Sequence, residues 1–96
     1  MEKLIISEQD IINALCIYSA RKKQVRSEDV EVELMFDDEY GFSAESWVNG
    51  RNQILITANI IEALRLWLDE VLRIDPFAAS IKLELSDEEG IIALIS

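Results

Sequence analysis

The dipeptide Asn49-Gly50, which stands between two stretches of alternating side chains, most strongly limits how this chain can fold. Both residues tolerate the positive φ angles of a type I′ turn, so the pair predicts a tight β-hairpin. Residues 42–48 alternate before the turn, and residues 51–57 predict the returning strand. Residues 30–36 alternate between apolar and acidic side chains and precede an acidic turn over residues 37–41. The sequence therefore predicts a three-stranded antiparallel meander.

Two helices are predicted, one on each side of the meander in the sequence. Ser7 is a suitable N-cap, with Asp10 three residues further on, for a helix over residues 8–23 that ends in basic side chains. Residues 58–74 place their apolar side chains on one arc, and Asp75-Pro76 predicts the end of this second helix. Residues 80–85 and 91–95 predict a final hairpin.

The predicted order of elements is α-β-β-β-α-β-β. This order predicts an α+β fold in one domain over residues 1–96, with both helices on one face of an antiparallel sheet. The pattern leaves open whether the last hairpin extends the meander or pairs elsewhere.

A helix, a meander and a second helix also occur in this order in the double-stranded-RNA-binding domain. That family contacts phosphates through lysines at the start of its second helix, where residues 58–63 here contain no cation and one acid, Glu62. The net charge of −10, from 9 basic and 19 acidic side chains, also opposes binding to nucleic acid or to an anionic membrane. We expect neither as a partner.

The absence of histidine and the single cysteine limit the chemistry that this chain can perform. They exclude an imidazole base, an internal disulfide and a thiolate zinc site. Cys16 lies in mid-helix without a nearby base, so we interpret it as a small buried side chain and not as a nucleophile. The first eight residues lack a signal peptide's apolar core, and a lone thiol suits a reducing compartment. We expect a cytoplasmic protein that is not an enzyme and has no cofactor.

Carboxylates are the remaining candidates for chemistry. Acidic turns and glutamates on the predicted open face of the sheet offer oxygen ligands for Ca²⁺ or Mg²⁺, or a general acid and base. Solvated charge on the wet face of an antiparallel sheet is the ordinary alternative. A carboxylate-based enzyme or a Ca²⁺- or Mg²⁺-binding protein is the second hypothesis for function. The turns are at residues 37–39 and 87–89, and the glutamates are Glu31, Glu33, Glu45 and Glu84.

The same open face is predicted to include Trp47, Met35 and Leu55. Tryptophan is common at binding hot spots. Ile17 and Leu66 fall outside the apolar arcs of their helices, and the last strand is apolar on both faces, which favours a second subunit. The first hypothesis is therefore a module for protein interaction or self-association, including a homodimer, without a small-molecule ligand. Mimicry of nucleic-acid charge, which would block a basic protein, is a third hypothesis.

Four short segments point to a known family. They are residues 7–14 (SEQDIINA), 30–35 (VEVELM), 40–45 (YGFSAE) and 48–51 (VNGR). With these segments the chain resembles the YxcD-like family of small uncharacterised bacillar proteins, over most of residues 5–75. That family has no established activity, so the resemblance implies no catalytic residue and no cofactor.

Overall fold

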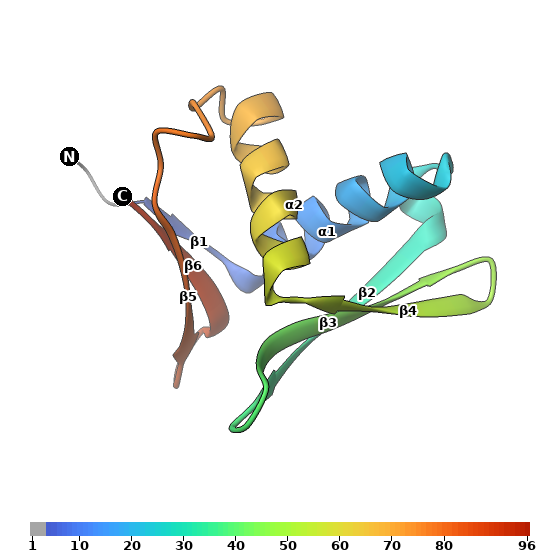
Figure 1. Cartoon of the computed structure of the whole chain (residues 1–96), viewed down its shortest axis with the longest axis horizontal. Helices are drawn as coiled ribbons and strands as arrows, with labels where there is room; N and C mark the ends of the chain where they lie inside the picture. Colours follow the sequence, from blue (N-terminus) through green and yellow to red (C-terminus); the bar gives the residue numbers. More distant parts are fainter. Residues whose placement is uncertain (1–3) are drawn as a thin grey trace.

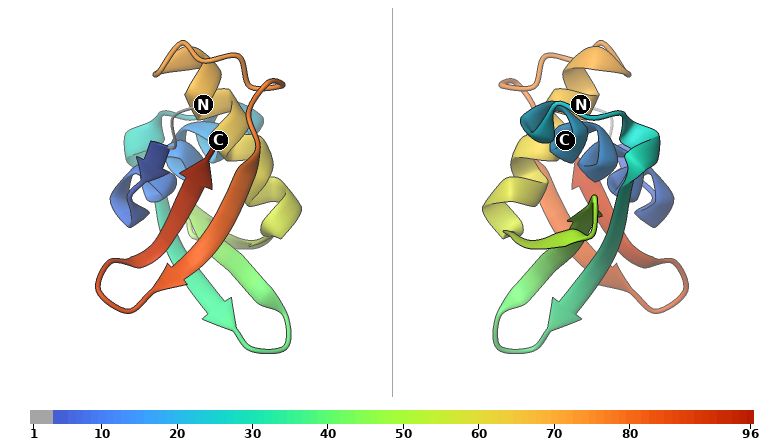
Figure 2. Two further views of the ribbon diagram at one scale, coloured as in Figure 1. Left: turned by 90° about the vertical axis from the view of Figure 1, so that its left-hand side faces the viewer. Right: turned by 90° about the vertical axis from the view of Figure 1, so that its right-hand side faces the viewer.

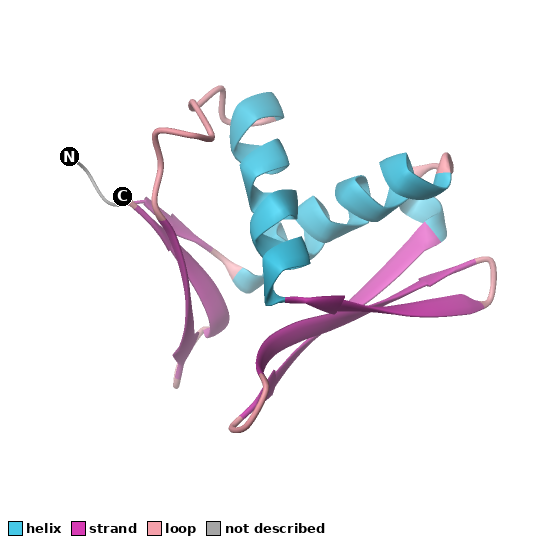
Figure 3. Cartoon of the chain, in the orientation of Figure 1, coloured by secondary structure: helices cyan, strands magenta, loops and turns pink. Residues whose placement is uncertain are grey.

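The computed structural model describes residues 4–96, so the first three residues of the predicted domain lie outside the described residues. Helices and strands follow each other in an α+β order, which confirms the predicted fold class (Figure 1, Figure 3). The elements are β1 (Leu4–Ile6), α1 (Glu8–Lys23), the 3₁₀ turn η1 (Ser27–Asp29), β2 (Val30–Asp37), β3 (Gly41–Val48), β4 (Arg51–Ile56), α2 (Thr57–Glu70), β5 (Ile81–Ser86) and β6 (Gly90–Ile95).

The strands form two separate antiparallel sheets. β2, β3 and β4 make the predicted meander, and both helices lie on the same face of it (Figure 1). β5 and β6 do not extend this sheet. They form a second sheet with β1, in the order β1-β6-β5, which is set at an angle to the meander (Figure 1, Figure 2). The pairing that the sequence left open is therefore resolved in favour of a separate sheet.

The strand β1 has no counterpart in the sequence prediction. Three residues are too few to show alternation, and their partner β6 lies at the other end of the chain. Because β1 and β5 flank it, β6 is a central strand with neighbours along both edges. Its side chains Ile91, Ala93 and Ile95 are buried in the core of the same chain. One face of β6 is thus explained without a second subunit, whereas Ile92 and Leu94 lie on its other face, and the homodimer stays a prediction.

Helix α1 has the predicted bounds and the predicted cap. Ser7 Oγ accepts a hydrogen bond from the backbone N–H of Asp10 at 3.2 Å. The helix contacts β2, β6 and α2, so more than one arc of its surface is covered. Ile17 is consequently half-buried against the core, as is Leu66 of α2. The expectation that these two side chains point away from the core is therefore wrong, whereas their role as partner contacts stays a prediction.

Helix α2 ends at Glu70 and not at residue 74. Beyond the helix, Arg73 adopts a left-handed φ of 58°, and the Ile74 N–H donates to the Leu68 carbonyl at 2.9 Å, which folds the backbone back on the last helical turn. The local backbone thus stops the helix before Pro76 can do so. No helix in residues 4–96 is long and apolar enough to cross a membrane.

The core lies between the two helices and the inner faces of both sheets. Its largest fully buried side chains come from β1 and from both helices, and they are Ile6, Ile11, Leu15, Ile60, Leu64 and Leu68. This packing fixes both helices against one face of the meander. The opposite face is left without a covering element among the described residues (Figure 1).

Candidate functional site on the open face of the meander

The register of the meander determines which side chains share its open face. Residues directly opposite one another in neighbouring strands project to the same side of a sheet. We define the open face by three such rows, which are Glu31, Trp47 and Asn52; Glu33, Glu45 and Ile54; and Met35, Ser43 and Ile56. Trp47, Met35, Glu31, Glu33 and Glu45 therefore share one face, as the sequence predicts.

Leu55 does not belong to this face, and its prediction is wrong. It is directly opposite Ala44, faces the helices and is only 3% exposed. Its sequence neighbours Ile54 and Ile56 occupy the open face instead, with 55% and 60% of their surface exposed. Sequence reasoning missed these two isoleucines.

The turn at Asn49-Gly50 contains the sequence signal that places Ile54 and Ile56 on the open face. The two residues have φ angles of 52° and 78°, as a type I′ turn requires, and Val48 pairs directly with Arg51. With two residues in the turn, an odd-numbered position of β3 shares its face with an even-numbered position of β4. Because Trp47 lies on the open face, the even-numbered residues of β4 must lie on that face too.

Glu84 lies in the other sheet and does not share the open face. It belongs to β5, where it is directly opposite Ile92 of β6. The alternation of apolar and polar side chains along β5 is correct, but alternation shows only which side of its own sheet a residue takes. Because β5 does not join the meander, the predicted cluster of four glutamates is reduced to Glu31, Glu33 and Glu45.

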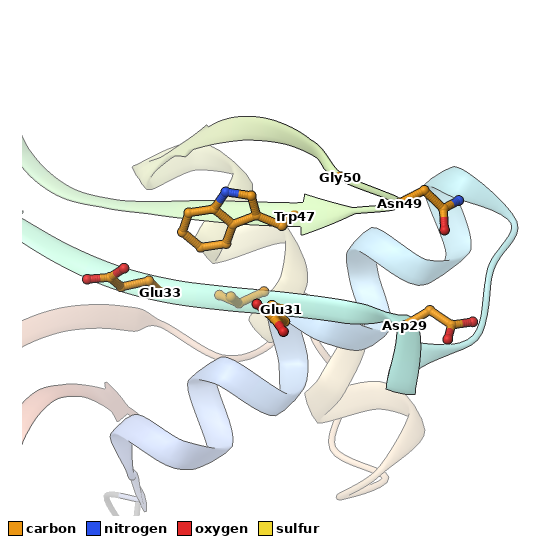
Figure 4. A pocket seen from close by; sticks show the side chains of 7 residues that line it. Asp29, Glu31, Glu33, Trp47, Asn49 and Gly50 are labelled. Carbon is orange, nitrogen blue, oxygen red and sulfur yellow. The ribbon is translucent and has the colours of Figure 1, made fainter.

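A shallow hollow of about 680 Å³ lies at one end of the open face. Figure 4 shows the Trp47 indole on the same side of the sheet as the carboxylates of Glu31 and Glu33. The hollow is open to solvent, unlike the enclosed clefts that bind small molecules, and is better suited to contact with another surface. Its lining residues are Asp29, Glu31, Val32, Glu33, Trp47, Asn49 and Gly50.

Within residues 4–96, the acidic side chains of this region have no cationic partner. Asp29, Glu31, Glu33 and Glu45 take part in neither of the two ion pairs found in residues 4–96. Glu33 lies directly opposite Glu45, an arrangement of like charges that destabilises a sheet. The surface is thus a concentration of unneutralised negative charge.

The carboxylate of Glu45 is held in place by an amide. The Asn52 side-chain nitrogen donates a hydrogen bond to Glu45 Oε2 at 2.7 Å. Asn52 belongs to β4, so this contact ties the central strand to the edge strand. It orients the carboxylate without neutralising its charge.

Among the described residues, three of the four cations near the end of α1, which are Arg21, Lys22 and Arg26 but not Lys23, contact groups of the same chain. Arg21 pairs with Glu70 at 2.6 Å, and Arg26 pairs with Glu28 at 2.5 Å. The Lys22 ammonium lies 4.7 Å from the centre of the Tyr18 ring. A phosphate ligand would have to compete with these contacts.

The two acidic turns use their polar groups to close hairpins. Asp37 Oδ1 accepts from two backbone N–H groups at 2.7 and 3.1 Å, and Ser86 Oγ accepts from two at 3.3 and 3.1 Å. Residues 4–96 contain no group of three or more acidic or thiol side chains arranged to hold a metal ion. The geometry gives no support to a metal-binding or carboxylate-based catalytic role for these turns.

Cys16 is half-buried on the side of α1 that faces β2. Its thiol donates a weak hydrogen bond to the Val30 carbonyl at 3.7 Å. Burial raises the pKa of the Cys16 thiol, because a thiolate would lose hydration there. The thiol is therefore protonated at neutral pH, as expected of a small packing side chain.

Comparison with known proteins finds relatives without an assigned activity. The family model described as "Protein of unknown function (DUF2653)" matches residues 1–88. The chain is 30% identical over 94 residues to "Uncharacterized protein YxcD" of Bacillus subtilis (strain 168), covering 97% of this chain and 92% of the relative. No solved structure matches. The resemblance to the YxcD-like family is confirmed.

Proposed function

We propose that this chain, which belongs to the DUF2653 family of proteins of unknown function, is a non-enzymatic protein-interaction module that binds through the open face of the meander. The observation that supports this proposal is the group of apolar side chains on that face, Trp47, Met35, Ile54 and Ile56. Single exposed apolar residues are ordinary, but several of them on one face of a rigid sheet are typical of a contact surface.

The arrangement of the face resembles that of protein interfaces in general. Such interfaces have aromatic and aliphatic side chains near their centre and polar groups around them. Here Trp47 is half-buried on the middle strand, with Glu31 directly opposite on one side and Asn52 on the other. A large, half-buried aromatic side chain in this position provides contact area at little cost in side-chain entropy.

The charge of the face favours a different protein as the partner over a second copy of this chain. A symmetric contact between two open faces would bring Glu31, Glu33 and Glu45 against an identical set of carboxylates. Facing like charges oppose such a contact. Sedimentation equilibrium of the purified protein tests self-association directly, and a dimer that is lost in Trp47→Ala would show that this face pairs with itself.

We also propose a cytoplasmic location and the absence of an enzymatic activity. The lone free thiol of Cys16 supports the first proposal, because reducing compartments keep thiols unpaired. The lack of any histidine in the sequence and the protonated state of Cys16 support the second. Cell fractionation with an antibody to the protein tests the location.

Photo-crosslinking tests the contact surface. A benzoylphenylalanine at position 54 is expected to form adducts with another protein in cells, and Trp47→Ala is expected to abolish them. The matched control is the same amino acid at position 85, since Leu85 is 50% exposed but lies on the other sheet. Circular dichroism confirms that each variant is folded. Equal adducts from both positions, or none from position 54, would contradict the proposed function.

A further inference from the structure

We infer that the partner of the open face is a protein segment in which arginine or lysine stands beside an apolar side chain, and that its cation binds between Glu33 and Glu45 next to Trp47. The inference rests on the proposed function, because it specifies the chemistry of a partner at the same surface. It concerns charge, whereas the proposed function concerns the surface itself, so the two can fail separately.

The first observation is the pair of like charges on neighbouring strands. Glu33 and Glu45 are directly opposite, at a position where side chains of a sheet lie about 5 Å apart at Cβ. The amide of Asn52 on β4 holds the Glu45 carboxylate on the side of β3 that lies away from Glu33, so the free protein keeps the two carboxylates apart without neutralising either of them. A guanidinium or ammonium group placed between the two carboxylates would remove the repulsion and form charge-assisted hydrogen bonds.

The second observation is the Trp47 indole beside these carboxylates. Cations bind favourably over the face of an aromatic ring, most strongly over tryptophan. In the part of the chain that the structure describes, the cation–π contact is between Lys22 and Tyr18, so the Trp47 ring has no cation of its own. The indole and the carboxylates of Glu31 and Glu33 line the same hollow and attract the same kind of group (Figure 4).

The third observation separates a protein segment from a small cation. Ile54 is directly opposite Glu45, and Ile56 follows it along the edge strand, both largely exposed. A polyamine would neutralise the carboxylates but would leave these isoleucines in water. A protein segment with an apolar side chain next to its cation covers both kinds of group. With a net charge of −10, a second copy of this chain is a poor source of the cation.

A peptide titration followed by amide NMR shifts tests the inference. The probe is the peptide acetyl-Arg-Ser-Leu-Ser-Arg-amide, whose arginines and leucine lie on one side when it is extended. We expect localised shifts at residues 31–35, 45–47 and 52–56 and at the Trp47 indole N–H, which Trp47→Phe distinguishes from that of Trp67. Binding should weaken as the salt concentration rises.

Matched variants identify the carboxylates that contribute. Glu33→Gln and Glu45→Gln should each weaken peptide binding about two- to five-fold, as expected for an exposed ion pair. Glu84→Gln removes the same charge from the other sheet and should leave the affinity unchanged. Glu33→Gln should also raise the urea midpoint of the free protein, because it removes a like-charge pair. A folding defect would instead lower that midpoint, so the two effects are distinguishable.

Three results would overturn the inference. The first is equal binding of a peptide with citrulline in place of both arginines, since citrulline has nearly the same shape without the charge. The second is equally tight binding of spermine, which would show that apolar contact is not required. The third is the absence of localised shifts at millimolar peptide. Adducts from position 54 together with any of these results would leave the contact surface in place and remove only the basic partner.

Discussion

Truncation of Leu55 and of Ile54, which are adjacent in β4, tests the assignment of the open face. The register places Leu55 opposite Ala44 on the core side and Ile54 opposite Glu45 on the open side. Leu55 is 3% exposed and Ile54 is 55% exposed. Leu55→Ala should therefore destabilise the protein strongly, while Ile54→Ala should have little effect on its stability.

The expected magnitudes follow from these two environments. Truncation of a buried leucine to alanine costs about 2–5 kcal/mol, because apolar contacts are lost and a cavity remains. In a domain of this size each kcal/mol shifts the melting temperature by about 4–8 °C, so Leu55→Ala should lower it by roughly 10 °C or more. Ile54→Ala removes side-chain atoms that are largely in water and should change stability by no more than about 0.5 kcal/mol.

Urea unfolding followed by far-ultraviolet circular dichroism measures both changes. This signal reports the backbone, so it does not depend on the environment of Trp47. Each variant should unfold in one transition with a similar dependence on urea concentration. If Ile54→Ala proves more destabilising than Leu55→Ala, the register is shifted by one residue, and the definition of the open face is wrong.

Three side chains outside the open face give further tests. The protonated Cys16 should react with a disulfide reagent at pH 7 at least about tenfold more slowly in the native than in the urea-unfolded protein, and equal rates would contradict its burial. Arg65 donates hydrogen bonds to the carbonyls of Pro76 and of Ala79. Arg65→Ala should therefore lower the free energy of unfolding by about 1–3 kcal/mol and speed amide exchange in residues 75–80. Unchanged exchange would show that these contacts do not hold the loop. The Tyr18 hydroxyl donates to Glu62 at 3.0 Å, and Tyr18→Phe should lower the free energy of unfolding by about 0.5–1.5 kcal/mol, whereas an unchanged urea midpoint would rule out a stabilising bond.

The features that could be predicted from the sequence depend on short-range signals. The cap at Ser7 and the type I′ turn at Asn49-Gly50 each involve a few neighbouring residues, and both are present in the structure. Such signals suffice to place α1 and the meander strands nearly at their observed bounds. They act through backbone hydrogen bonds and φ angles that do not depend on the rest of the fold.

The features that could not be predicted depend on contacts between distant segments. β1 is defined by its pairing with β6. Glu84 is separated from the other glutamates because β5 pairs with β6 in the second sheet and not with a strand of the meander. Alternation along a strand does not specify which sheet the strand joins. Ile17 is half-buried because α1 contacts elements on several sides, which a helical wheel drawn for one partner does not anticipate.

The open face departs from the arrangement that would make this sheet most stable. A meander arranged for stability alone would have opposite charges at the positions of Glu33 and Glu45, and polar side chains in place of the exposed Ile54 and Ile56. The other face follows the usual rule, with buried side chains such as Ala44 and Leu55 against the helices. Departures from local stability rules are expected where a surface serves binding. A partner with a cation beside an apolar group would neutralise the pair Glu33 and Glu45 and cover Ile54 and Ile56 in one contact. The chemistry proposed for the partner therefore follows from these two unfavourable features of the free protein.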